Sequence, residues 1–82
     1  MNTKRIGKLV RKSRKEQGLT QAEAAGYLNV GIRFLSDLEN GKPTVQLEKA
    51  IHVLEGLGFK LLAVSKANQK LIRYVEGHLG EQ

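Results

Sequence analysis

The spacing of helix-stop residues is the feature that most constrains the fold of this chain. Gly18, Asn29, Gly41 and Gly58 each follow a stretch in which apolar residues recur with the helical period. Glycine and asparagine tolerate the left-handed backbone that ends many helices. The sequence therefore predicts an all-α fold, a small bundle of four to five helices.

Four helices are expected before Gly58, and capping residues mark their starts. The expected helices span residues 3–17, 21–28, 32–40 and 45–57. Thr3 and Thr44 are expected to cap the first and the last of them. Thr20 and Glu23 have the spacing of a capping box, in which each side chain bonds the backbone amide of the other residue.

The chain changes character after Gly58. Residues 59–64 are mainly apolar and too few for a helix, so we expect a strand. A lone strand leaves its backbone groups unpaired, so pairing with the same segment of a second copy is expected. An extended tail or one more short helix is the alternative. A fifth helix is expected over residues 68–79. The predicted division is a 1–58 domain, a 59–65 dimerisation strand and a 66–82 helix or flexible tail.

The positive charge is concentrated in one element. Residues 1–16 hold seven basic side chains and one carboxylate, so this segment carries the whole net charge of +6. Basic groups near a helix N-terminus oppose the helix dipole, so helix stability does not explain them. Either the charge is a solvated helix face, or it attracts phosphates.

Composition excludes several classes of function. The chain has no cysteine, and its two histidines, His52 and His78, lie far apart, so neither disulfides nor a zinc site is expected. No apolar run is long enough to span a bilayer, and the N-terminal residues are charged rather than apolar, so a cytoplasmic protein is expected. No catalytic constellation or phosphate loop is visible, so we expect neither an enzyme nor a cofactor.

The segment Leu28-Asn29-Val30-Gly31 joins two short helices by a tight turn. Together with Leu19-Thr20-Gln21-Ala22-Glu23-Ala24-Ala25 and residues 35–42, it resembles the lambda-repressor-like, XRE-type helix-turn-helix family of DNA-binding proteins over about residues 3–58. Ala24 stands where that family usually has leucine. Asn29 and Gly31 stand where it usually has glycine and serine or threonine.

Residues 33–44 and 53–58 also resemble HipB-type antitoxins. That resemblance implies a homodimer that represses its own operon and binds a HipA-like serine/threonine kinase toxin. The dimerising residues would then be the apolar ones after Gly58: Phe59, Leu61, Leu62 and Val64.

The family resemblance implies a role for individual residues on the DNA side. Those expected to contact DNA are Thr20, Gln21, Gly31, Ile32, Arg33, Ser36, Asp37, Asn40 and Lys42. Thr20, Gln21, Asn40 and Lys42 would lie near phosphates, and Gly31, Ile32 and Arg33 would read bases. Asp37 would either accept from a cytosine amine or orient Arg33. Arg14 and Glu39 would form an ion pair between the first and third helices.

Arg33 has a structural alternative, that of a solvated arginine. Phe34, which flanks the DNA face, is expected in the core, and His52 is expected at the core edge or at the dimer interface rather than in a catalytic role. The expected function is a sequence-specific repressor acting on operator DNA, as a HipB-like antitoxin. A stand-alone or phage-type regulator without a toxin, or an interaction module without DNA binding, is the alternative.

Overall fold

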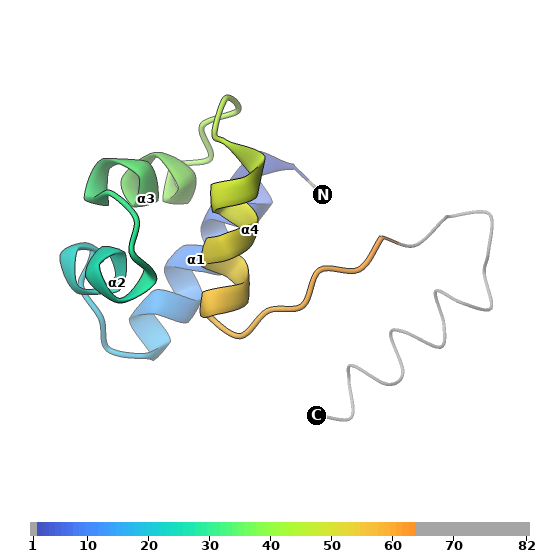
Figure 1. Ribbon diagram of the computed structural model, residues 1–82. Coiled ribbons are helices and arrows are strands. Elements are labelled where there is room, and N and C mark those ends of the chain that lie inside the picture. The colour runs from blue at the N-terminus through green and yellow to red at the C-terminus, as the bar shows by residue number, and fades with distance from the viewer. Residues whose placement is uncertain (1, 64–82) are drawn as a thin grey trace.

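The computed structural model describes residues 2–63 of the chain. Within them the backbone forms four helices and no strand: α1 (Thr3–Glu16), α2 (Gln21–Leu28), α3 (Ile32–Glu39) and α4 (Leu47–Gly56). α3 packs against both α1 and α2, and α4 packs against α2 (Figure 1). The predicted all-α class is confirmed. None of these helices is long and apolar enough to cross a membrane.

The N-cap of the first helix lies one residue earlier than predicted. Asn2, not Thr3, is the N-cap, and its side chain accepts a hydrogen bond from the backbone amide of Arg5 at 2.9 Å. The prediction of Thr3 as the cap was wrong, because Asn2 has the extended backbone of an N-cap and Thr3 is already the first residue of the helix. The Thr3 hydroxyl donates to the Gly41 carbonyl oxygen, 2.9 Å away, and ties the start of α1 to the chain beyond α3.

The second helix has the predicted ends. Thr20 Oγ1 accepts from the Glu23 amide at 3.1 Å, and Glu23 Oε1 accepts from the Thr20 amide at 2.9 Å, so the capping box is present. Asn29 ends the helix in the left-handed conformation, with a φ of 56°. Both predictions are confirmed, because they depend on contacts within a few residues.

The last helix starts later than predicted. Gln46 is its N-cap, and no side chain caps it. The prediction of Thr44 as the cap was wrong: Pro43 and Thr44 form a turn, and Val45 packs against the core before the helix begins. The segment between α3 and α4 therefore contributes to the core without being helical.

Small and large side chains interlock in the core. Its buried apolar residues are Val10, Ala24, Ala25, Leu28, Leu35, Leu38, Ala50, Val53 and Leu54. Three of them are alanines, whose small side chains leave room for neighbouring helices. Leu35 and Leu38 are 0% and 1% exposed, so the inner face of α3 is fully buried. This burial sets which side of α3 remains in solvent.

At Gly7, α1 lies very close to the end of α3. A Cβ added to Gly7 would meet the Leu38 carbonyl oxygen and lie 2.6 Å from the Glu39 carbonyl oxygen. Gly41, with a φ of 76°, packs equally closely on Lys4, where an added Cβ would lie 2.8 Å from its Cα. The first turns of α1 therefore rest directly on the backbone at the end of α3.

The predicted C-terminal strand is not formed within the chain itself. Residues 59–63 are neither helix nor strand and lead away from the helices at the end of α4 (Figure 1). Phe59 packs against the core, whereas Leu61 and Leu62 are about half exposed. The described residues end at residue 63. Outside them lie Val64, Tyr74, His78 and the predicted helix over residues 68–79.

Gly7→Ala should destabilise the protein by about 1–3 kcal/mol, because the added methyl group overpacks the α1–α3 contact. Urea unfolding followed by circular dichroism measures this change. Gly26→Ala is the matched control: a Cβ there meets nothing within 4 Å, so alanine should stabilise α2 by about 0.5–1 kcal/mol. Equal effects at the two glycines would contradict the close contact.

Candidate nucleic-acid interface

α3 presents two residues of its N-terminal turn to solvent. Its opposite side is held by Leu35 and Leu38, so the helix cannot rotate without exposing the core. Ile32 is 51% exposed although it is apolar, and Arg33 beside it is also exposed. Gly31 is the N-cap and offers no side-chain hydrogen bond. The start of α3 is therefore open to approach by another molecule.

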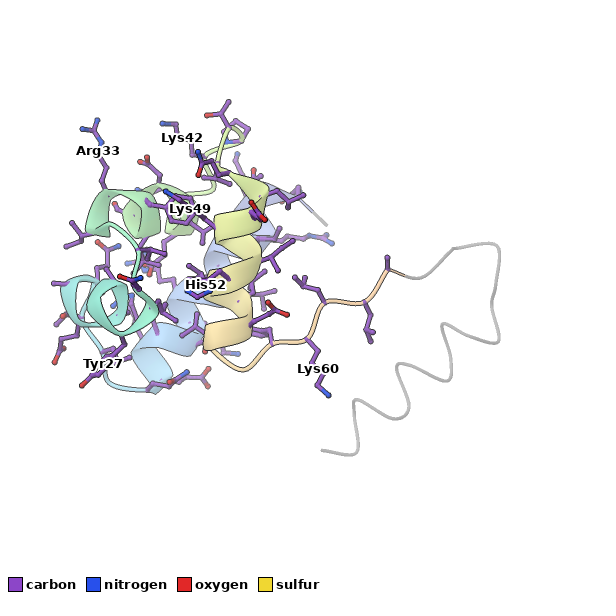
Figure 2. The ribbon with its side chains drawn as sticks, in the orientation of Figure 1. Tyr27, Arg33, Lys42, Lys49, His52 and Lys60 are labelled. Atoms are coloured by element: carbon purple, nitrogen blue, oxygen red, sulfur yellow. The ribbon has the colours of Figure 1, made fainter. Side chains whose placement is uncertain are left out.

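Arg33 and Lys42 point away from the bundle on the same side of the molecule (Figure 2). Arg33 projects from α3, and Lys42 from the segment that follows α3. Tyr27, which is 79% exposed, lies at the opposite end. The fold thus brings Arg33 and Lys42, two of the residues that the family resemblance assigns to DNA contact, to one side of the molecule.

A buried ion pair holds α3 in this orientation. Arg14 Nε lies 2.6 Å from Glu39 Oε2, and Arg14 Nη2 donates to Glu39 Oε1 at 2.9 Å, so the contact is bidentate. Arg14 Nη1 also donates to the Leu19 carbonyl oxygen at 2.8 Å. Gln21 Nε2 donates to the same carboxylate at 3.1 Å. This cluster joins α1, the loop before α2, the first turn of α2 and the end of α3.

The ionisation of this pair follows from its contacts. Burial raises the pKa of Glu39, but hydrogen bonds from Arg14 and Gln21 and the charges of Arg14 and Arg11 outweigh it, so the pKa lies below 4.5. The hydrogen bond to Glu39 is the main reason that the pKa of Arg14 is raised; burial opposes this rise, and the charge of Glu39 adds to it. Both groups are therefore charged at neutral pH.

Several donors at the start of α2 already have partners within the protein. The amide of Thr20 and the amide of Glu23 already bond within the capping box, which also lowers the pKa of Glu23. The Gln21 side chain is half-buried and bonds Glu39. Gln21 is thus held in place beside α3.

The residues at the end of α3 are divided between solvent and internal contacts. Asp37 pairs with Lys42 at 3.5 Å, so its ion pair goes to Lys42 and not to Arg33 as one alternative expected. Ser36 is half-buried, and Asn40 is exposed at the C-cap, where its amide bonds the Ser36 carbonyl oxygen. Lys42 therefore has a negatively charged neighbour. Arg33 makes no ion pair with another of residues 2–63.

Two residues of α4 near this surface were not singled out for it from the sequence. Lys49 Nζ lies 5.8 Å from the centre of the Phe34 ring, which packs against the core as predicted. His52 is exposed, and its Nε2 lies 2.6 Å from the Leu28 carbonyl oxygen. A carbonyl only accepts, so His52 donates here and supports the turn between α2 and α3. Neither contact has a local sequence signal, since both join residues far apart in the chain.

Comparison with known proteins agrees with this geometry. The family model described as Helix-turn-helix matches residues 10–63, which include α2, the turn at Asn29 and α3. The chain belongs to this helix-turn-helix family. The matched region also includes the Arg14–Glu39 pair and the extended segment up to residue 63.

Two relatives of this helix-turn-helix protein have names that describe regulation. An HTH-type transcriptional regulator of Sinorhizobium fredii, named as the uncharacterised protein y4mF, is 58% identical over 53 residues, which are 65% of this chain and 70% of the relative. The ImmF control region 10 kDa protein of Bacillus phage phi105 is 32% identical over 68 residues, 80% of this chain and 76% of the relative. Neither name describes an enzyme.

Glu39→Gln should lower the free energy of unfolding at pH 7 by about 3–5 kcal/mol, because it leaves the Arg14 guanidinium buried without a counter-ion. The pH dependence should change as well. Since folding lowers the pKa of Glu39, its contribution is present above about pH 4.5 and is lost as the pH falls through the folded pKa.

Chemical denaturation between pH 7 and pH 2.5 measures both effects. The stability of Glu39→Gln should fall less with acid than that of the wild type. Glu55→Gln, which changes an exposed carboxylate on α4, is the control and should keep the wild-type slope. The same acid slope in wild type and Glu39→Gln would show that the pair does not govern this response.

Proposed function

We propose that this protein is a sequence-specific DNA-binding transcriptional repressor. The observation that carries the proposal is the exposed start of α3, where Ile32 and Arg33 face solvent on a helix whose other side is buried. In a helix-turn-helix, the N-terminal part of the second helix enters the major groove. Arg33 would then bond guanine O6 and N7, and Ile32 would contact a thymine methyl group.

The surroundings of α3 supply the phosphate contacts of this proposal. Lys42 lies on the same side as Arg33, and Lys49 of α4 adds a positive charge beside Phe34. Thr20, at the N-terminus of α2, and Asn40 would approach the DNA backbone, where helix dipole and side-chain amide favour phosphate. Gln21 would contact phosphate while its side chain also bonds Glu39. Ser36 and Asp37 would make secondary base contacts.

The proposed active form is a homodimer. Leu61 and Leu62 are exposed on a segment whose backbone forms no strand within residues 2–63, and such a segment is suited to pairing with a second copy. Two-fold symmetry would place the two recognition helices on half-sites roughly 34–36 Å apart. Residues 59–65 would be the dimerisation segment, although Phe59 packs on its own core.

The finer proposal is that this repressor is a HipB-like antitoxin that autoregulates its operon and restrains a HipA-like serine/threonine kinase. It is supported by the resemblance of residues 33–44 and 53–58 and by the apolar segment after Gly58. A phage-type regulator without a toxin is the second candidate, and the similarity to a phage control-region protein favours it. A kinase gene beside this gene would support the first, and co-purification of the two products would test it directly.

Binding to the DNA upstream of the gene tests the main proposal. The protein should bind this DNA in the presence of excess random DNA of equal length, and binding should weaken as salt rises. Arg33→Ala should weaken it by about 1–3 kcal/mol and relax the preference at one base position. Electrophoretic mobility shift at two salt concentrations measures both effects.

Lys15→Ala is the control for Arg33→Ala, because it removes one positive charge from an exposed residue in the last turn of α1. It should change affinity for operator and random DNA alike. Equal losses in Arg33→Ala and Lys15→Ala would remove Arg33 from base reading. Binding to upstream and random DNA with the same affinity would refute a specific operator.

Leu61→Asp/Leu62→Asp should weaken the dimer by about tenfold or more, because it places charges in the proposed apolar contact. Sedimentation equilibrium measures the dissociation constant. Leu47→Asp is the control, since Leu47 is a 71% exposed leucine on α4. An unchanged dimer in the double variant would place the interface elsewhere.

A further inference from the structure

One face of α1 has the composition of a docking surface. Arg5, Lys8, Leu9 and Lys12 follow the spacing i, i+3, i+4, i+7 and therefore lie along one side of the helix. They line a shallow hollow of about 300 Å³. Leu9 is 39% exposed and sits among three basic side chains. We name this the Leu9 face.

The Leu9 face points away from the proposed DNA surface. Gly7 and Arg14 both contact the end of α3, so they mark the side of α1 that is turned toward it. At 3.6 residues per turn, the Leu9 face lies on roughly the opposite side of α1 from these two residues. A duplex bound along the start of α3 would therefore leave the Leu9 face accessible.

The charge of this face is not used inside the described structure. None of Arg5, Lys8 and Lys12 makes an ion pair with another of residues 2–63. α1 has no acidic residue in its first turn, so Arg5 and Lys8 oppose the helix dipole without local compensation. These side chains therefore cost helix stability, and no ion pair within residues 2–63 offsets that cost.

We infer that the Leu9 face docks an acidic, amphipathic protein segment that places an apolar side chain against Leu9 and carboxylates against Arg5, Lys8 and Lys12. Charge complementarity selects an acidic partner, and the exposed leucine selects one with apolar anchors. The site goes beyond the proposed repressor function and does not depend on it. Because it lies opposite α3, partner and DNA bind at the same time.

A protein segment fits this face better than a second nucleic acid. Contacts to DNA phosphates use the charge of Lys and Arg and need no exposed leucine between them. An amphipathic helix uses both, because its residues at i, i+3, i+4 and i+7 meet a surface of matching length. The apolar anchor is thus the feature that separates the two partners experimentally.

Two synthetic helical peptides test the inference. One carries leucines at i, i+3, i+4 and i+7 flanked by glutamates, and the other has serine in place of every leucine. The wild-type protein should bind the leucine peptide about tenfold more tightly than the serine peptide, measured by fluorescence anisotropy at physiological salt. Amide NMR shifts should locate the bound peptide on α1.

Three variants assign the binding to the Leu9 face. Leu9→Ser should abolish the preference for the leucine peptide. Lys8→Glu should weaken binding of the leucine peptide by about tenfold, because it places a carboxylate opposite the glutamates of the peptide. Lys60→Glu, an equal change of charge on an exposed residue outside the helices, should weaken it far less. Circular dichroism checks that each variant remains helical.

The other outcomes overturn the inference. Equal binding of both peptides would mean that bulk charge alone attracts them. Equal losses in Lys8→Glu and Lys60→Glu would place the peptide elsewhere. Displacement of bound upstream DNA by the leucine peptide would assign the face to nucleic acid. The peptide measurements need no DNA, so they stand even if the protein has no operator.

Discussion

The bidentate contact between Arg14 and Glu39 is the interaction on which the arrangement of the helices depends. Two buried charges are unfavourable unless each is fully paired, and here the guanidinium also bonds the Leu19 carbonyl while the carboxylate also bonds Gln21. Separating α1 from α3 would leave both charges unpaired in a small core. The pair therefore ties the exposed face of α3 to the rest of the bundle, and with it the position of Arg33.

The same helix that supplies Arg14 also carries the excess positive charge of the chain. Gly7 lets α1 lie directly on the end of α3, which divides its basic residues between two environments. Arg14 is enclosed and structural. Arg5, Lys8 and Lys12 lie on the far side, together with an exposed leucine. One short element thus stabilises the proposed DNA-reading helix and offers a separate surface to a protein partner.

Local features of the chain could be predicted, and features that need distant residues could not. The capping box at Thr20 and the left-handed Asn29 depend on neighbours within three residues, so the pattern of residue types was sufficient. Thr3 and Thr44 have the same capping chemistry, yet neither caps a helix. Thr3 instead bonds Gly41, 38 residues away, and Thr44 lies in the turn that brings Val45 to the core. The Asp37 carboxylate likewise forms its ion pair with Lys42 rather than with Arg33.

By itself, the sequence determined that this chain forms short helices and where α2 begins and ends, because periodicity and local hydrogen bonds act over a few residues. Resemblance to a family added the expectation that Arg14 pairs with Glu39. Only the tertiary structure decided that Gln21 bonds Glu39, that His52 bonds the end of α2, and that the Leu9 face points away from α3. These depend on how helices pack, and packing is decided by contacts between residues far apart in the chain.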